Sequence, residues 1–492
     1  MSDATSRLEF IIVGASVSGL ASAIGLKASG HRVRVLEKDL QLGGIGSVPN
    51  GSGCAQVPPN GCKILSDWGL DAELQANSAP ISGFTMYKYD AAGSVSPDFI
   101  GVNLWDEEML SEARGGYMQL PLSHRELVRI LYEFAVKPTE EHPTPLVSVL
   151  FGQEVVSVDC NACSVTLRSG EIHSADGILG ADGARGVVRR ALKAEEEALP
   201  DSDVWTGISA YRSVSFLSLA AGIDQSYQYR YPECTTWITS QRAARTFPVG
   251  KDRDLSLLVY TPDSSQDPTW TEEAEKKLVD VLGTECDAHL RKLAALAGTS
   301  TCVQIKDHGD LDSWVSESGR VLAIGDAAHP FPPGALHSYS CSLEDGVFVG
   351  KLFSHTQSAD RIPEFMRAFQ EHRESRCTHI RDGEKEILRL MMLPEGPEKI
   401  ATEVSMRKKQ AAGRNVLEGD LESLLDDFIT VFSYDARDDA DEYWMAWGRY
   451  RDDGSLSSGP LKMAFTSFEQ QFAEGSESES EEDLFFVSKK ID

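Results

Sequence analysis

A glycine-rich turn close to the amino terminus constrains the fold of this chain more than any other feature. The apolar run Phe10–Val13 ends at Gly14, and residues 18–29 have the small side chains of a closely packed helix. Arg32–Glu37 alternates arginine with valine and is read as a second strand, and a strand, a tight turn, a helix and a second strand in this order predict a parallel βαβ unit. We therefore expect an α/β domain at the start of the chain.

The residues of this turn have nearly the spacing of a dinucleotide-binding site. Gly14 permits the tight turn and Gly19 lets the helix approach the strand, while the helix N-terminus offers N–H groups to a pyrophosphate. Glu37, followed by Lys38, ends the second strand where a carboxylate would accept ribose hydroxyls. Ser16 replaces the middle glycine of the usual pattern, so the alternative is a tight turn that binds nothing.

Charge and length exclude several classes of protein. The 492 residues carry a net charge of −29, which opposes binding to nucleic acid and to anionic membranes. We find neither an apolar run that would span a membrane nor the pattern of a secretory signal, so we expect a soluble, cytoplasmic protein. Part of the charge lies in Glu474–Asp483, a low-complexity run with nothing apolar to bury, which we expect to be disordered.

The nine cysteines are scattered, as is usual for free thiols in a reducing compartment. Cys160 and Cys163 have a spacing that suits zinc or redox chemistry, but no second pair faces them. Because they lie between two strand-like runs, we expect a plain hairpin turn there and keep a metal or redox role as the alternative. No metal site is expected elsewhere.

Two further glycine–aspartate segments follow short apolar runs. The first runs from Gly180 through Asp182 to Arg185, and the second begins with Gly325 and Asp326. An aspartate beside a glycine is often only a turn residue. A carboxylate at the end of a buried strand nevertheless lies where open α/β sheets bind their ligands, so both segments are candidates for a binding site.

The three motifs, in this order and at this spacing, resemble the fingerprints of the class A flavoprotein aromatic hydroxylases, the family of salicylate and p-hydroxybenzoate hydroxylases. The resemblance covers roughly residues 8–390. It implies an α/β fold with α+β elements: a Rossmann-like FAD-binding domain, an inserted antiparallel-sheet substrate domain and C-terminal helices. The expected segments are 1–78, 121–195 and 301–395 for the FAD domain, 79–120 and 196–300 for the substrate domain, 396–470 for a C-terminal extension and 471–492 for an acidic disordered tail.

Longer helices are expected outside these motifs, from their period and their capping residues. Residues 123–136 form one of them, with Ser123 as its N-cap, and residues 362–393 form another. A single helix is expected over residues 271–297, and an amphipathic helix over residues 417–434.

The resemblance implies roles toward FAD for individual residues. Glu37 would hold the adenosine ribose, and the Val155 backbone would contact the adenine. Arg125 would lie near the pyrophosphate and the ribityl chain, whose hydroxyls Asp326 would bind. Each of these positions also has a plain reading as a turn residue or a solvated charge.

The flavin end of the cofactor is expected near the later motifs. Asp182 and Arg185 would contact FAD and NAD(P)H, and Pro333 would lie at the flavin edge. Many family members then have G-Q-G, where this chain has Leu336–Ser338; N–H groups from there to Tyr339 would still face the flavin, but without glycine the loop geometry is left open. The expected cofactor-binding residues are Gly14, Ser16, Gly19, Glu37, Lys38, Arg125, Val155, Asp182, Arg185, Gly325, Asp326, Pro333, Ser338 and Tyr339.

Residues 205–262 are expected to provide the substrate pocket. They are rich in aromatic and β-branched side chains that alternate with polar ones, as in an antiparallel sheet with one covered face. Arg212 would bind a substrate carboxylate, although aromatics at this spacing are also typical of a core. The candidates are Tyr211, Arg212, Tyr229, Trp237 and Phe247, and no catalytic residue is assigned.

The activity that the resemblance implies is hydroxylation of a small electron-rich aromatic, phenolic or indolic, in specialised metabolism or aromatic catabolism. NADPH or NADH would reduce the bound FAD, and O2 would add at the flavin C4a to give a hydroperoxide that attacks the ring. The enzyme would be a monomer or a homodimer. Epoxidation, oxidative decarboxylation and a flavin-binding protein without hydroxylase activity are the alternatives.

Overall fold

The computed structural model describes residues 7–42, 53–79, 81, 83–91, 97–105, 120–139, 142–196, 204–215, 234–239, 241–263, 276–417 and 430–448. The chain divides into two units, Met1–Tyr443 and Trp444–Asp492. The described part of the second unit is the π-helical turn Trp444–Gly448, and everything below concerns the first. Tyr229, residues 418–429 of the expected amphipathic helix and the acidic run 474–483 lie outside the described residues.

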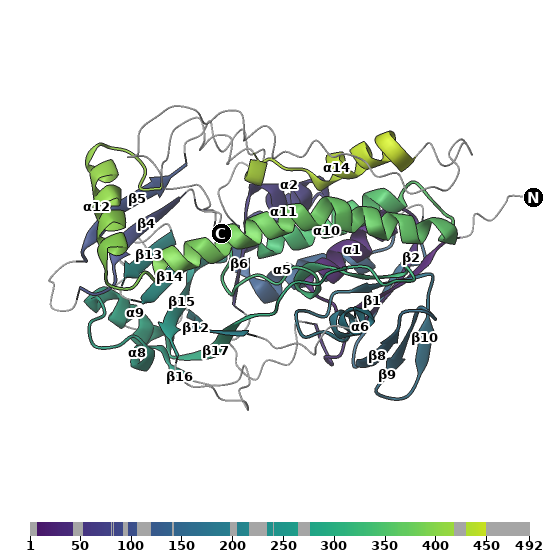
Figure 1. Cartoon of the computed structure of the whole chain (residues 1–492), viewed down its shortest axis with the longest axis horizontal. Coiled ribbons are helices and arrows are strands. Elements are labelled where there is room, and N and C mark those ends of the chain that lie inside the picture. Colours follow the sequence, from purple (N-terminus) through teal and green to yellow (C-terminus); the bar gives the residue numbers. More distant parts are fainter. Residues whose placement is uncertain are drawn as a thin grey trace, which may run out of the picture. The chain divides into compact units, whose positions relative to one another are not determined.

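A five-stranded parallel sheet has the strand order β18-β11-β1-β2-β7, and Figure 1 labels β1 and β2 of it. Helix α1 (Val17–Ala28) joins β1 to β2, so the βαβ unit predicted from the sequence is confirmed. Since all five strands run the same way, the turns that follow β1, β11 and β18 meet at one edge of the sheet. The strands are β1 (Glu9–Val13), β2 (Arg32–Leu36), β7 (Val147–Leu150), β11 (Gly177–Gly180) and β18 (Val321–Ala323).

Helices α1, α5 (His124–Val136) and α10 (Ser338–Phe353) pack together beside this sheet. The backbones of α1 and α10 touch, because a Cβ on Gly25 would lie 2.4 Å from the Gly346 oxygen. Gly346 lies against Ala21 and Gly350 lies against Gly25, so the two helices run parallel. Their N-termini therefore lie at the same end, near the turn that follows β1.

An eight-stranded, mostly antiparallel sheet has the order β16-β17-β12-β15-β14-β13-β4-β5, in which only β13 and β4 pair in parallel. Strand β17 crosses the expected domain boundary at residue 300, and the domain division itself stays a prediction. The strands are β4 (Gly83–Lys88), β5 (Phe99–Leu104), β12 (Val204–Ser215), β13 (Cys234–Thr239), β14 (Arg242–Val249), β15 (Asp254–Pro262), β16 (Lys276–Lys277) and β17 (Thr299–Asp307).

Two small sheets, β10-β9-β8 and β3-β6, and several further helices complete the described fold. None of the described helices has both the length and the apolar composition needed to cross a membrane. The strands are β3 (Cys54–Val57), β6 (Leu120–Ser123), β8 (Val155–Asp159), β9 (Ser164–Leu167) and β10 (Ile172–Ser174). The helices are α2 (Pro59–Asp67), α3 (Asp71–Asn77), α6 (Val187–Glu195), α8 (Leu278–Val281), α9 (Ala288–Ala297), α11 (Ile362–Met391), α12 (Pro397–Ala411) and α14 (Ala436–Tyr443), with 3-10 turns at Gly325–Ala327 and Ala359–Arg361.

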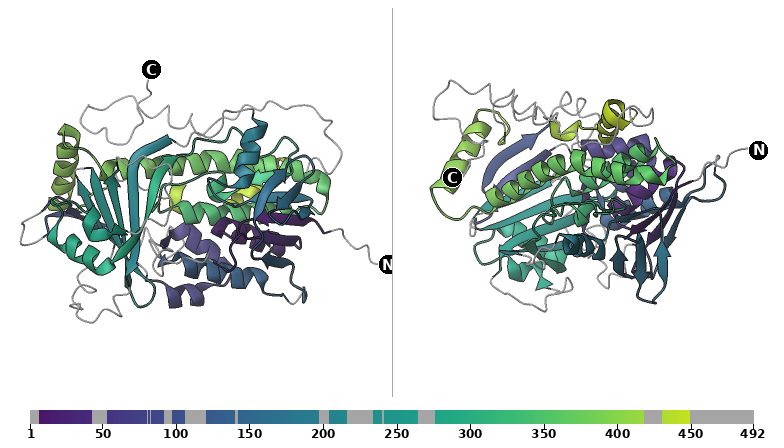
Figure 2. Two further views of the ribbon diagram at one scale, coloured as in Figure 1. Left: turned by 90° about the horizontal axis from the view of Figure 1, so that it is seen from below. Right: turned by 45° about the vertical axis from the view of Figure 1, so that its right-hand side comes forward.

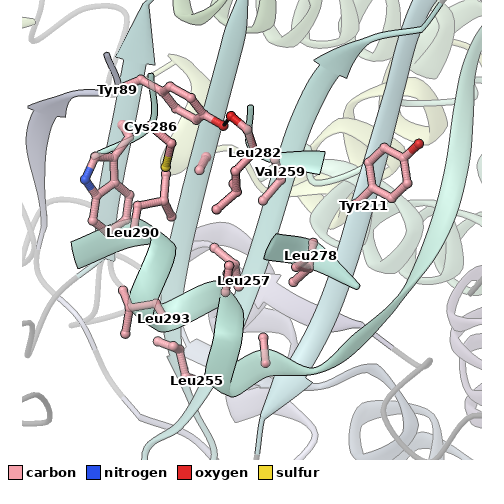
Figure 3. Close-up of a cluster of buried hydrophobic side chains, with 14 of the residues drawn as sticks. Tyr89, Tyr211, Leu255, Leu257, Val259, Leu278, Leu282, Cys286, Leu290 and Leu293 are labelled. Carbon is pink, nitrogen blue, oxygen red and sulfur yellow. Dashed lines mark hydrogen bonds between the residues drawn. The ribbon is translucent and has the colours of Figure 1, made fainter. Parts of the chain in front are cut away.

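The two faces of the eight-stranded sheet pack against different helices (Figures 1 and 2). Leu257 and Val259 of β15 join a core cluster with Leu290 on the face that α8 and α9 cover (Figure 3). Leu258 and Tyr260 point to the opposite face and cluster with side chains from the end of α11 and from α12. Consecutive side chains along one strand thus point to opposite faces of the sheet, as the two-residue period of a strand requires.

Two expectations about local structure have different outcomes. The single helix expected over residues 271–297 is wrong within the described residues, because Gly283 has a φ of +75° and Asp287 starts a new helix by accepting two of its first N–H groups. Both are residues that end or begin helices.

By contrast, Cys160 and Cys163 lie in the turn between β8 and β9, so the predicted hairpin turn is confirmed.

Candidate active site

Backbone contacts make the glycines of the first turn necessary. Gly14 has a φ of +101°, and a Cβ there would lie 2.6 Å from the carbonyl oxygen of Ala181. A Cβ on Gly19 would lie 2.2 Å from the Gly14 oxygen. Ser16, which stands in place of the middle glycine, is the N-cap of α1, and its hydroxyl accepts the Gly19 N–H at 3.2 Å. The serine therefore stabilises the start of the helix while other first-turn N–H groups keep no intrahelical partner.

The three turns that were predicted to share one cofactor lie at the same edge of the parallel sheet. The N–H of Ala181, in the turn after β11, donates to the carbonyl of Val13 at the end of β1 at 2.8 Å. A Cβ on Gly325, in the turn after β18, would lie 2.3 Å from the Ser18 hydroxyl of α1. Segments far apart in the sequence therefore meet around the N-terminus of α1.

The Glu37 carboxylate lies beside the first turn. Its Oε2 accepts the Ala15 N–H at 2.7 Å, and its Oε1 accepts the Asp39 N–H at 2.9 Å. A carboxylate has about four acceptor positions, so about two stay available to the hydroxyls of a ligand. The Gln153 N–H donates to the Glu37 carbonyl at 2.8 Å, which brings the start of β8 at Val155 close to this acid.

The aspartates of the second and third turns have different surroundings. Asp182 caps α6 because its Oδ2 accepts the N–H groups of Val187 and Val188, while its Oδ1 is buried without a partner among the described residues. Solvent reaches Asp326, although protein surrounds it closely enough for desolvation to raise the pKa of its carboxyl. Burial also raises the pKa of Asp182. Asp182 thus serves first as a helix cap, whereas Asp326 is open to a ligand.

A buried charge network lies behind the third turn. Asp345 lies 2.7 Å from His329 Nε2 and accepts the N–H of Gly325 at 2.9 Å and the Nε–H of Arg373 at 3.1 Å. Burial alone would lower the pKa of His329, but Cys377 and Asp345 raise it. The ligand atoms of His329, Asp345 and Cys377 lie within 4.8 Å of one another, as in a metal site. Since the Arg373 guanidinium already supplies the positive charge there, we assign an ion-pair network.

Three of the expected cofactor residues are exposed basic side chains. Lys38 follows the second strand, Arg125 lies in the first turn of α5, and Arg185 lies in the turn before α6. Within the described part of the chain, Arg125 makes no hydrogen bond or ion pair. It is therefore free to meet an anion, and the roles of all three toward a cofactor stay predictions.

The loop from Pro333 to Ser338 contacts the eight-stranded sheet. The Tyr260 hydroxyl donates to the Pro333 carbonyl at 2.7 Å, and Arg245 donates to the Gly334 carbonyl at 3.3 Å. Helix α10 begins directly afterwards at Ser338, and the N–H groups of its first turn have no intrahelical partner. The residues expected at the flavin edge therefore lie between the parallel sheet and the eight-stranded sheet.

Two arginines in one row of the eight-stranded sheet face this loop. Arg212 on β12 and Arg245 on β14 both pair with Leu258 on the strand between them, so the three side chains share one face. A Cβ on Gly334 would lie 2.2 Å from the Leu258 side chain. Among the described residues neither guanidinium forms a close ion pair, although the charges of Arg245 and the buried Glu384 carboxylate attract each other. The Arg212 Nε–H donates to the Thr301 hydroxyl at 3.2 Å. Both arginines therefore offer positive charge to a ligand between loop and sheet.

The structure does not bring all predicted substrate residues to this row. Tyr211 points to the opposite face, into the core under α8 and α9 (Figure 3), and Trp237 is fully buried in the same cluster. This corrects the expectation that they line the pocket, because successive residues of a strand point to opposite faces. Phe247 lies on the arginine face, 4.9 Å from the Arg245 guanidinium, but is buried. Tyr229 lies outside the described residues.

A histidine that sequence reasoning did not select lies next to this row. His124 Nδ1 is 3.2 Å from the Tyr339 hydroxyl, and the two rings are 5.8 Å apart. Burial, and then the charge of Arg212, lower the pKa of His124 to about 4, so the ring is neutral at neutral pH. Its position directly before Arg125 was a weak signal, but only the fold shows that it meets Tyr339.

These donors and acceptors fit FAD. The glycine cradle and the N-termini of α1 and α10 supply N–H groups for a pyrophosphate and for flavin carbonyl oxygens. Glu37 and Asp326 supply acceptors for ribose and ribityl hydroxyls. The buried, unpartnered Oδ1 of Asp182 adds an acceptor at the same edge of the sheet.

Comparison with known proteins agrees with this fit. The family model described as "FAD binding domain" matches residues 7–383. The FAD-dependent monooxygenase OpS4 of Beauveria bassiana (strain ARSEF 2860) is 25% identical over 405 residues, which cover 82% of this chain and 90% of that protein. The hispidin-3-hydroxylase of Neonothopanus nambi is 26% identical over 396 residues, covering 77% and 88%.

Solved structures with the same fold include two complexes. A salicylate hydroxylase with its substrate has a TM-score of 0.66 and 20% identity, with coverage of 89% of this chain and 98% of that one. HpxO of Klebsiella pneumoniae with FAD and uric acid has a TM-score of 0.66 and 17% identity, with coverage of 86% and 96%.

Proposed function

This chain belongs to the FAD-binding-domain family and is a FAD-dependent monooxygenase of the aromatic hydroxylase type, and we propose that it hydroxylates a small acidic aromatic compound with NADPH or NADH and O2. The observation that carries the substrate class is the pair Arg212 and Arg245 on one face of the sheet. The ring would be phenolic or indolic, because an electrophilic oxygen attacks the carbon with the highest electron density.

The cofactor would be held by the backbone of the three turns and by a few side chains. The turn from Gly14 to Gly19 would bind the pyrophosphate, Glu37 the adenosine ribose and Asp326 the ribityl hydroxyls. The first N–H groups of α10 would face the flavin carbonyls. When bound, FAD supplies the redox chemistry, taking a hydride from the nicotinamide and allowing O2 to deliver one oxygen atom to the ring.

The two arginines would bind and orient the substrate. A partly buried guanidinium without a carboxylate partner, such as that of Arg212, is costly, and an anionic ligand between loop and sheet would pair with it. Arg212 and Arg245 lie two strands apart, so one would bind a carboxylate and the other an ionised hydroxyl of the same small molecule. Two similar proteins are named as hydroxylases of salicylate and of hispidin, which supports a small hydroxylated substrate.

The pair His124 and Tyr339 would orient a substrate hydroxyl. With its own proton on Nε2, neutral His124 can accept the Tyr339 O–H at Nδ1 across 3.2 Å, so the Tyr339 oxygen keeps its lone pairs for the substrate O–H. The positive charge of Arg212, which together with burial keeps His124 uncharged, would favour loss of the substrate proton to solvent. Deprotonation raises the electron density of the ring, which favours attack by electrophilic oxygen.

The proposal is tested on the purified protein with a panel of acidic phenols and indoles. We expect a yellow protein whose NADPH or NADH oxidation rises when one of these compounds is added, with a product that has gained one oxygen atom by mass spectrometry. Loss of a carboxyl group in the product would indicate oxidative decarboxylation. If no acidic aromatic stimulates nicotinamide oxidation, the proposed reaction is refuted.

The assignment of Asp326 is tested separately. In Asp326→Ala the ribityl hydroxyls lose an acceptor, and we expect the Kd for FAD to rise about 100-fold, which corresponds to about 2.7 kcal/mol. Titration of the apoprotein with FAD, followed by flavin fluorescence, measures it. A variant that binds FAD with unchanged affinity removes Asp326 from the site.

A further inference from the structure

The loop before α10 is held by three side chains from three separate elements. Tyr260 of β15 binds the Pro333 carbonyl, Arg245 of β14 binds the Gly334 carbonyl, and Glu384 of α11 accepts the His337 N–H at 3.0 Å. These contacts engage consecutive peptide groups from both ends of the loop. Residues 333–337, the pre-α10 loop, are therefore positioned by side chains that are distant in the sequence.

Glu384 makes two of the hydrogen bonds to this loop, whereas Tyr260 and Arg245 make one each. Its carboxylate accepts backbone N–H groups of both Leu336 and His337, and its side chain is buried. Burial raises the pKa of Glu384, and Arg245 and the two N–H groups oppose this rise. A buried carboxylate is costly unless it accepts strong hydrogen bonds, so the contacts to the loop are what make this position tolerable for an acid.

The loop does not obtain its shape from glycine at positions 336–338. Among the described residues, positive φ values outside glycine occur only at Cys163, Gln241 and Arg253, so Leu336–Ser338 have ordinary backbone conformations. Gly334 is the exception, with a φ of +83°, and a Cβ there would meet Leu258 and Tyr260. The glycines of the G-Q-G pattern that the family resemblance implies at positions 336–338 are thus not needed for this backbone conformation, and Glu384 accepts the N–H groups of Leu336 and His337.

We propose that Glu384 is the positioning residue that orients the pre-α10 loop for FAD in this chain. By accepting the N–H groups of Leu336 and His337, it leaves the following N–H groups of Ser338 and Tyr339, which have no partner among the described residues, for the cofactor. This inference rests on the proposed function, since it takes FAD as the ligand of α10. Glu384 itself contacts neither substrate nor the reacting atoms.

The test uses Glu384→Gln, which keeps the size of the side chain but replaces one acceptor with an NH2 donor that opposes a backbone N–H. We expect the variant to fold, its Kd for FAD to rise about tenfold, and the absorption bands and midpoint potential of its bound flavin to shift without substrate. Glu386→Gln is the matched control. Glu386 lies on the same helix, is exposed and, among the described residues, pairs only with Arg389, so the flavin properties of this variant should equal those of the wild type.

A folded Glu384→Gln holoprotein with wild-type FAD affinity, spectrum and potential overturns the proposal. If this variant does not fold, Tyr260→Phe takes its place, because it removes the hydroxyl that contacts the Pro333 carbonyl and Arg245. A shift of the flavin bands in Tyr260→Phe supports positioning by the loop contacts, and unchanged bands overturn it. These readouts need no substrate. A wild-type protein whose nicotinamide oxidation is not stimulated by any aromatic compound would refute only the proposed reaction and not the role of Glu384.

Discussion

The parallel sheet and the eight-stranded sheet contribute to the candidate site in opposite ways. At the edge of the parallel sheet, the site consists of backbone: Gly14 and Gly19 permit contacts that no side chain could enter. On the eight-stranded sheet, it consists of side chains whose common face follows from strand register, with Arg212 and Arg245 aligned through Leu258. Changes at the first region should therefore abolish cofactor binding, whereas changes at the second should alter substrate affinity.

Gly19→Val should have the largest effect and tests whether the first region depends on backbone sterics. A Cβ there meets the Gly14 oxygen at 2.2 Å, so we expect a loss of about 3 kcal/mol or more in unfolding free energy and no retained FAD. Gly30→Ala is the control, since its φ is also positive (+83°) but nothing lies within 4 Å. It should lose about 1 kcal/mol and keep FAD. Urea unfolding measures the free energy of unfolding, and the ratio of flavin to protein absorbance measures the FAD content. A Gly19→Val protein with full FAD content would show that cofactor binding does not depend on this backbone contact.

Arg212→Ala should have the next largest effect and tests the second region. Loss of a charged hydrogen bond to the substrate costs about 1.5–3 kcal/mol, so we expect KM to rise about 10- to 100-fold with FAD content unchanged. Tyr211→Phe is the control, because Tyr211 is the neighbour in the same strand but points into the core. Its KM should equal that of the wild type. Equal effects of both variants on KM would show that the face assignment is wrong.

The dependence of folding stability on pH tests the burial of His124, which lies between the two regions. The pKa of His124 is about 4 in the folded protein and about 6.5 when unfolded, so the unfolded state takes up the proton first as pH falls. His124 should therefore leave the free energy of unfolding unchanged above about pH 6.5 and lower it by about 2 kcal/mol at pH 5. Urea unfolding at pH 7 and pH 5 should show a smaller pH effect in His124→Phe. The same dependence in both proteins would mean that His124 is not buried as described.

Ser16→Gly should have the smallest effect and tests how strictly the first region depends on its glycines. Restoring the usual glycine removes the N-cap, which costs a few tenths of a kcal/mol, and removes one hydroxymethyl group near the turn. We expect the Kd for FAD to stay within about threefold, because Ser16 has an extended backbone that needs no glycine. Ser16→Ala, which also loses the cap but gains no freedom, should cost about 1 kcal/mol. A large change in FAD affinity in Ser16→Gly would show that the serine itself contacts the cofactor.

Local sequence patterns were enough to predict the βαβ unit with its glycine turn and the start of α5. The order of Gly14, the helix after it and the acid Glu37 was enough to predict the βαβ unit, and Ser123 marked the start of α5. These predictions rest on local sterics and capping, which involve residues close together in the chain. The same local reasoning failed over residues 271–297, where a helical pattern outweighed the signals of Gly283 and Asp287.

The contacts between side chains from distant segments became visible only in the folded protein. The sequence placed Tyr211 and Arg212 together as substrate residues, but the pleat of β12 sends them to opposite faces. It contained no sign that Arg245 shares a row with Arg212, or that Glu384 reaches the loop before α10. Strand register and helix packing create these contacts between residues far apart in the chain, and no local pattern encodes their distance.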